Sequence, residues 1–224
     1  VIGTDEFDVF MDSNDLWKIA FDENKSDRSI SNAFLKGKLS KSLQSTLRNY
    51  LNNVKSPIAV RSSSLLEDSQ YQPLAGMYAT YMLPNTGKSK STRLEELEKT
   101  IKLVYASTFL KEPKALIKAS VHHHEEEKMA VIIMELIGNQ HENRFYPSVS
   151  GLAQSFNYYP TSYIKRSDGV AYLALGLGKT VVDGKKSLRF CPKYPKLIHQ
   201  FYSIKSTVES SQHEFYALNI NKGK

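Results

Sequence analysis

The chain has 224 residues, of which 41% are hydrophobic and 11% aromatic, and its formal net charge is +7. This composition excludes a disordered chain and is typical of a globular protein. No apolar run approaches the roughly 20 residues that a transmembrane helix needs, and the first residues show no signal-peptide pattern. The sequence holds one cysteine, Cys191, which excludes an intrachain disulfide and a cysteine-based zinc site. We therefore expect a cytoplasmic location.

The positive charge is spread along the chain and comes with no recognition helix, zinc finger or aromatic–basic strand motif. We interpret it as solvated surface and expect no nucleic acid and no membrane among the partners. A cleft that binds a triphosphate would use part of the same excess.

The part of the chain before residue 58 is predicted to be mainly helical. Thr4 or Asp5 is expected to cap the first helix and Asn14 to end it, and Ser40 is expected to cap a longer one. In both helices apolar residues recur at spacings of three and four, which places them on one face: Phe7, Phe10 and Met11 in the first, and Leu43, Leu47, Tyr50 and Leu51 in the second.

Strands and helices mix from residue 58 onward. Residues 58–60 and 79–83 are predicted strands, a long amphipathic helix follows from Thr92, and a shorter one follows Pro113 and ends near residue 119. The continuous apolar run at 129–134 predicts a central strand. Further strand patterns cover residues 145–159, with an interruption at Ser150 and Gly151, and residues 170–175. This mixture predicts an α+β fold with α/β character.

The segment IAVRSSSLLEDSQYQPLAGMYATY, residues 58–81, is the most informative part of the sequence. A buried strand ends in Arg61, whose guanidinium suits a phosphate because it stays charged and gives two parallel hydrogen bonds. Gly76 permits a close approach of the backbone to an anion. The hydroxyl of Thr80 is a further donor. The pattern indicates a polyphosphate site.

When each of these residues is taken alone, an ordinary structural role explains it better. Arg61 is then a salt-bridge partner of Glu67 or Asp68, Gly76 a plain turn glycine and Thr80 a strand residue. The spacing between the three residues decides between the two interpretations.

That spacing resembles the phosphate-binding signature of the phosphoenolpyruvate synthase and pyruvate phosphate dikinase family. The family pattern is R-S-S-A-x-x-E-D, then S-F-A-G, then a threonine, and the chain keeps the intervals from Arg61 to Gly76 and Thr80 without gaps. The resemblance implies that these three residues bind the phosphates of ATP, with Arg61 in the catalytic role and a flexible flap around Gly76. Glu67 and Asp68 are expected to orient Arg61.

A second segment, VIIMELIG at residues 131–138, is similar to the family's V-V-V-Q-x-M-V hinge strand of an ATP-grasp fold. The resemblance implies that Met134, Glu135 and Ile137 frame the adenine. Met134 stands where the family has glutamine and replaces a hydrogen bond with an adaptable apolar contact. Glu135 and Ile137 are expected to face the base through their backbone. The alternative is a plain buried strand.

Three other patterns carry less weight. Residues 150–157 resemble S-G-V-x-F-T-x-N-P, and residues 176–184 resemble G-L-G-E-x-V-V-x-G with Lys179 in place of the glutamate. Turns are the expected role of these glycines, because no P-loop motif is present. His122, His123 and His124 point in different directions on any regular backbone, so they predict an exposed turn and no metal site.

Taken over the whole length, the resemblance implies an incomplete ATP-grasp-like nucleotide-binding domain with mixed or antiparallel sheets. Its first lobe, about residues 1–135, holds the arginine, and its second lobe covers about residues 136–224. The implied ligands are ATP and Mg²⁺, with the metal ligands expected outside this chain. The implied partner is a phosphohistidine carrier domain of the same parent protein.

The implied reaction uses ATP to phosphorylate the carrier histidine, which passes the phosphoryl group to pyruvate. This chain alone is expected to bind nucleotide weakly and to turn over nothing. Two alternatives stay open: the ATP lobe of a related dikinase or antibiotic phosphotransferase with another acceptor, and a non-catalytic nucleotide-binding domain.

Overall fold

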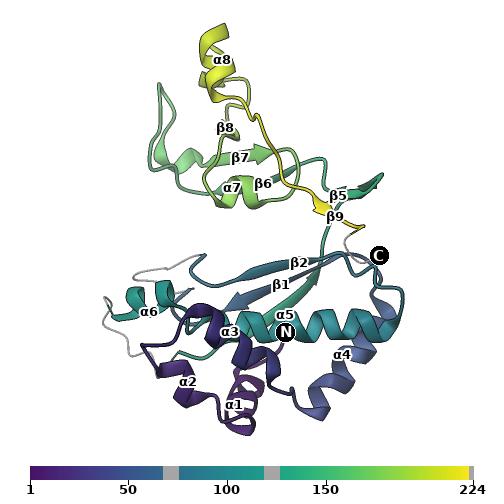
Figure 1. Cartoon of the computed structure of the whole chain (residues 1–224). Helices are drawn as coiled ribbons and strands as arrows, with labels where there is room; N and C mark the ends of the chain where they lie inside the picture. Colours follow the sequence, from purple (N-terminus) through teal and green to yellow (C-terminus); the bar gives the residue numbers. More distant parts are fainter. Residues whose placement is uncertain (68–75, 119–126, 222–224) are drawn as a thin grey trace. The chain divides into compact units, whose positions relative to one another are not determined.

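The computed structural model describes residues 1–67, 76–118 and 127–221. Helices and antiparallel strands mix along the chain, which confirms the predicted α+β class. The chain divides into two compact units (Figure 1). Unit 1 comprises Val1–Leu136 and the C-terminal residues from Asn221, and unit 2 comprises Ile137–Ile220. In the described ranges no helix is both long and apolar enough to cross a membrane.

Unit 1 is a three-stranded antiparallel sheet with helices packed on one face (Figure 1). The strand order is β2-β1-β3, so β1 lies in the middle. The strands are β1 (Ile58–Ser63), β2 (Thr80–Leu83) and β3 (Ala130–Glu135). The helices are α1 (Thr4–Ser13), α2 (Trp17–Phe21), α3 (Asp27–Lys36), α4 (Lys41–Asn53), α5 (Lys90–Ser107) and α6 (Lys111–Lys118).

The core of unit 1 is rich in aromatic rings from the helices. The ring of Tyr105 on α5 lies 5.1 Å from that of Phe7 and 5.5 Å from that of Phe10, measured between centroids. Burial of a large apolar side chain contributes about 1.5–3 kcal/mol, so this cluster holds α1 on α5. The helix faces predicted from spacing are confirmed, because their members are buried or, for Tyr50, partly buried against the core.

The predicted cap of the first helix is wrong, whereas that of the longer helix is confirmed. Gly3, and neither Thr4 nor Asp5, is the N-cap of α1, and no side chain caps that end. Helix α1 therefore begins at Thr4, earlier than a cap at Thr4 or Asp5 would allow. Ser40 caps α4, and its Oγ accepts a hydrogen bond from the Leu43 N–H at 3.0 Å.

The apolar run predicted as a central strand forms β3, which is an edge strand. Ile2 covers part of its outer edge. The Ile2 N–H donates to the Val131 carbonyl at 2.8 Å, and the Val131 N–H donates to the Ile2 carbonyl at 3.0 Å. Met129 and Val131 are fully buried and Ile133 packs against the core, whereas Met134 is 47% exposed, so the apolar run holds both buried and exposed residues.

A buried arginine fixes the point where α4 leads into β1. Arg93 on α5 is 7% exposed, and its guanidinium donates to the carbonyls of Leu51 and Val54, both at 3.1 Å, and to Asn85 Oδ1 at 3.3 Å. Asn85 in turn donates to the Ser56 carbonyl at 2.9 Å. A cation suits the last carbonyls of α4, because the C-terminal end of a helix carries partial negative charge.

Unit 2 contains two small antiparallel sheets, ordered β4-β5-β9 and β6-β7-β8. Its elements are β4 (Asn139–His141), β5 (Arg144–Tyr146), β6 (Ser150–Gln154), η2 (Arg166–Asp168), β7 (Val170–Ala174), α7 (Lys179–Val182), β8 (Leu188–Phe190), η3 (His199–Phe201), α8 (Ile204–Ser210) and β9 (Leu218–Asn219). The predicted interruption at Ser150 and Gly151 is wrong, because both residues belong to β6. The break falls earlier, at Pro147, which lacks the N–H that a strand pairing uses.

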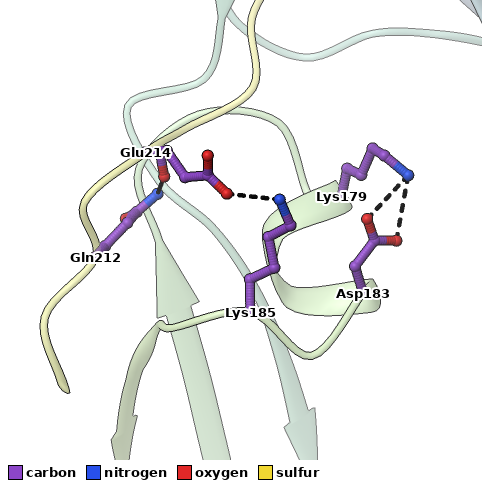
Figure 2. Close-up of polar contacts among 5 residues, drawn as sticks. All are labelled: Lys179, Asp183, Lys185, Gln212 and Glu214. Carbon is purple, nitrogen blue, oxygen red and sulfur yellow. Dashed lines mark hydrogen bonds and ion pairs between the residues drawn. The ribbon is translucent and has the colours of Figure 1, made fainter. Parts of the chain in front are cut away.

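Polar contacts tie the end of unit 2 to the segment around α7 (Figure 2). Lys185 Nζ lies 2.5 Å from Glu214 Oε1, and Gln212 Nε2 donates to the Glu214 carbonyl at 2.9 Å. The hydrogen bond with Glu214 raises the pKa of Lys185, and the same bond lowers the pKa of Glu214. Because the pair is solvated, it contributes little to stability.

We predict that Arg93→Ala lowers the free energy of unfolding by about 3 kcal/mol, because buried carbonyls lose a charged donor. Trp17, the single tryptophan, lies in unit 1 with its ring centroid 6.1 Å from that of Phe7. Its fluorescence in urea therefore reports the unfolding of this unit. The matched control is Arg48→Ala, which removes an exposed arginine from α4. Equal losses in the two variants would contradict the role given to Arg93.

Candidate functional site

Arg61 and Thr80 lie side by side on the face of the unit 1 sheet that the helices leave open. The pairing of β1 with β2 places Arg61 directly opposite Thr80. Both residues are exposed, whereas Val60 and Ser62, the neighbours of Arg61 along β1, are fully buried. Because successive side chains of a strand point to opposite faces, the fold brings the arginine and the threonine together on the solvent side.

Among the residues that the structure describes, no hydrogen bond or ion pair engages the guanidinium of Arg61. The alternative salt bridge to Glu67 does not form, nor does Glu67 orient Arg61 through an ion pair. Its carboxylate instead accepts a hydrogen bond from the Ser62 hydroxyl at 2.8 Å. Asp68, the other expected partner, lies outside the described residues.

Gly76 has a backbone conformation that favours glycine. Its φ is +79°, in the left-handed region, and a Cβ atom at this position would meet no atom of the described residues within 4 Å. Space is therefore not what restricts this position; the backbone angle is. The remaining part of the expected flap, residues 68–75, lies outside the described residues.

An apolar row crosses the sheet next to Arg61 on the same open face. Ala59 on β1 lies opposite Met82 on β2 and Met134 on β3, and we call these three residues the methionine row. Met134 is 47% exposed, while Ala59 is covered at 5% exposure. The row lies two residues along β1 from Arg61, or about 7 Å. Two flexible, polarizable side chains thus flank a small one.

The backbone of Glu135 points to the outer edge of β3. The Leu136 N–H donates inward, to the Pro57 carbonyl at 2.8 Å, whereas Val131 pairs outward with Ile2. The N–H and C=O groups of successive strand residues alternate between the two edges. Glu135 lies four residues after Val131, so its N–H and C=O point to the same outer edge as those of Val131. A planar ligand at this edge would find a donor and an acceptor there.

The side chain of Glu135 accepts a hydrogen bond from the Ser56 hydroxyl, which leaves its backbone as the group that faces outward. Ile137, in contrast, is the first residue of unit 2 and is 84% exposed. Of the six predicted site residues, unit 1 therefore holds five, namely Arg61, Gly76, Thr80, Met134 and Glu135.

The described residues do not fit a magnesium site of their own. They include no group of three or more histidine, cysteine or acidic side chains that could hold a metal ion. Glu67 is bonded to Ser62, and Glu127 accepts a hydrogen bond from the Tyr78 hydroxyl. The run from His122 to His124 lies outside the described residues.

The glycine motif of unit 2 serves as a pair of turns around α7. Gly176 and Gly184 have φ values of +86° and +65°, and Gly178 is the N-cap of α7. Lys179, the residue that departs from the family pattern, lies 2.9 Å from Asp183 Oδ2 in an ion pair along the helix (Figure 2).

Residues 1–223 match the sequence model of a family described as the pyruvate phosphate dikinase AMP/ATP-binding domain. The chain belongs to this family. No match was found among curated proteins. Membership identifies the chain as an ATP-binding portion of a pyruvate phosphate dikinase-like enzyme, and the small antiparallel sheets with their helices are consistent with the expected ATP-grasp-like fold.

Within this dikinase domain, sequence reasoning missed Ala59 and Met82. Ala59 stood inside a run interpreted only as a buried strand, and Met82 inside a short strand without a motif. Once β1 and β2 are paired, their register with Met134 assigns both to the open face. Strand alternation alone indicates the face, but only the pairing shows which residues are neighbours.

We predict that Arg61→Ala changes the free energy of unfolding by less than about 0.5 kcal/mol, because the exposed guanidinium has no partner to lose among the described residues. Urea titration followed by Trp17 fluorescence measures this change. A loss above about 1 kcal/mol would show that Arg61 holds the fold together and would weaken its assignment to a ligand.

Proposed function

We propose that the open face of the unit 1 sheet binds ATP, with the phosphates at Arg61 and Thr80 and the adenine at the methionine row. The single observation that carries this proposal is the placement of Arg61, without a partner among the described residues, directly opposite Thr80. Family membership supplies the ligand class. The pairing supplies the local arrangement.

The phosphate end combines three kinds of donor. Arg61 gives parallel, charge-assisted hydrogen bonds to phosphate oxygens, each worth about 1.5–3 kcal/mol net. Thr80 adds a hydroxyl from the neighbouring strand. Gly76 has a left-handed backbone, and no described atom lies within 4 Å of a Cβ position there, so it offers a backbone N–H that a ligand can approach.

The adenine end is apolar on the face and polar at the edge. Met82 and Met134 give polarizable contacts to a flat ring, with the small, covered Ala59 between them. The outward backbone of Glu135 is suited to the hydrogen-bonding edge of the base. Ile137 is proposed to continue this contact through its own backbone, as the family resemblance implies.

In the parent protein, we propose that the bound ATP phosphorylates a histidine on a carrier domain, for transfer to pyruvate. Magnesium bound with ATP would neutralise charge on the phosphates, and its protein ligands are proposed to lie outside this chain. Arg61 would orient the phosphoryl groups and stabilise their charge. The isolated chain would bind nucleotide without turnover. We propose a cytoplasmic location, where the single thiol of Cys191 stays reduced.

We predict that Arg61→Ala weakens the binding of ATP by roughly ten- to a hundredfold and leaves the affinity for adenosine unchanged, because only the phosphates lose a contact. Isothermal titration calorimetry with ATP, with and without MgCl₂, measures both affinities. Thr80→Val, which keeps the shape and removes the hydroxyl, is expected to weaken ATP binding by roughly two- to tenfold.

Arg48→Ala removes the same charge from α4 and serves as the control for net charge. Equal ATP affinities in wild type, Arg61→Ala and Arg48→Ala would remove Arg61 from the phosphate site. Parallel losses for ATP and adenosine in Arg61→Ala would instead assign the arginine to the fold or to the base.

A further inference from the structure

A buried hydrogen bond lies next to Gly76 and uses a residue outside the family motif. The Tyr78 hydroxyl donates to Glu127 Oε1 at 2.9 Å, and the two residues are 5% and 3% exposed. Tyr78 stands midway between Gly76 and Thr80, and Glu127 lies just before β3. A hydrogen bond to a carboxylate is stronger than one between neutral groups, and it is costly to break when the carboxylate is buried.

Two further hydrogen bonds hold the chain that follows Arg61. The buried Ser62 hydroxyl donates to Glu67 Oε2 at 2.8 Å, and Ser64 Oγ accepts from the Glu67 N–H at 3.2 Å. Burial raises the pKa of Tyr78, and the charge of Glu127 and, more weakly, that of Glu67 raise it further, while Ser64 acts in the opposite direction. We call Ser62, Ser64, Glu67, Tyr78 and Glu127 the anchor cluster.

In the described segment 76–80, the residues nearest to Gly76 are Met77, which packs partly buried against the core, and Tyr78, which is held by its hydrogen bond. Thr80 is held by its strand pairing, and the Ala79 N–H donates to Ser107 Oγ at 3.2 Å. A Cβ atom at Gly76 would meet no atom of the described residues within 4 Å. Within the described residues, the position of the Gly76 N–H therefore depends on the packing of Met77 and on the bond that Tyr78 makes two residues further on.

Stability alone does not account for the Tyr78–Glu127 pair. Phenylalanine with an apolar partner would fill a similar volume and avoid the desolvation of a carboxylate, and such replacements are often neutral or stabilising. Among the described residues Tyr78 is the only hydrogen-bond partner of the Glu127 carboxylate, and no cation pairs with it. The pair instead fixes the orientation of the tyrosine ring, because its hydroxyl must point at the carboxylate of Glu127 to form the hydrogen bond.

We propose that Tyr78 and Glu127 are positioning residues for phosphate binding: their buried hydrogen bond holds Gly76 where its backbone N–H meets the phosphates. The inference rests on the proposed function and deepens it. Neither residue contacts ATP. Both act through Gly76, so their loss reduces the contribution of the phosphates to binding and leaves that of the base intact.

The first test needs no nucleotide. Amide hydrogen exchange is measured by mass spectrometry on peptides that cover residues 76–80, in wild type, Tyr78→Phe and Glu127→Gln. Loss of the hydroxyl is expected to speed exchange there by roughly tenfold, with peptides from α5 unchanged. Glu127→Gln keeps a carbonyl oxygen as acceptor and is expected to stay close to wild type. Equal exchange in wild type and Tyr78→Phe overturns the proposal.

The second test is the affinity for ATP and for adenosine, measured by calorimetry. Tyr78→Phe is expected to weaken ATP binding by roughly three- to tenfold and to leave adenosine binding unchanged. Loss of both affinities together would indicate a merely structural role and overturn the proposal, as would an unchanged affinity for ATP. Retention of wild-type values in Glu127→Gln would support it, because that variant preserves the bond.

Two further outcomes keep the tests decisive. Tyr78→Phe leaves the buried carboxylate of Glu127 without its donor. If this variant does not fold for that reason, the double variant Tyr78→Phe/Glu127→Leu removes both polar groups, and the same results are expected from it. If wild type does not bind ATP at all, the proposed function fails. The separate claim that the Tyr78–Glu127 bond holds Gly76 in place is then supported by faster exchange in Tyr78→Phe and overturned by equal exchange.

Discussion

The position of β1 in the middle of its sheet decides which residues of unit 1 become neighbours. Its inward side chains, such as Val60 and Ser62, are fully buried against the helices, which leaves Arg61 on the opposite face. Pairing on both sides then gives Arg61 a hydroxyl neighbour in Thr80 and an apolar one in Ile132. A guanidinium that finds no partner within the described fold is available to an anion from outside, and the phosphates of ATP are the anion that family membership indicates.

Most of unit 1 was predictable because its signals are local. Phe7 and Leu43 mark the buried faces of α1 and α4 through helical spacing, and Ser40 caps α4 through its own hydroxyl. The spacing between Arg61, Gly76 and Thr80 is likewise a local signal, and the phosphate site that it predicts stays a proposal. Each of these features depends on residues close in sequence, which is what patterns record well.

Features that depend on distant residues were not predictable from local patterns. The edge position of β3 follows from the strand order, which an apolar run does not report, and the residue that covers its outer edge, Ile2, is far away in sequence. The methionine row requires the register of three strands. The bond between Tyr78 and Glu127 joins two polar residues whose sequence neighbourhoods carry no sign of the contact. In unit 2, small sheets with many exposed residues gave weak periodicity, so β8, α8 and β9 had no clear signal.

The most direct test of the central claim uses four of the five methionines as reporters. Met82 and Met134 lie on the open face with Arg61, whereas Met11 and Met129 are fully buried in the core. In a protein labelled with ¹³C at its methionine methyl groups, titration with Mg·ATP should shift the signals of Met82 and Met134 and leave those of Met11 and Met129 in place. Saturable binding of ATP with the Met82 and Met134 signals unmoved would contradict the assignment of the nucleotide to this face.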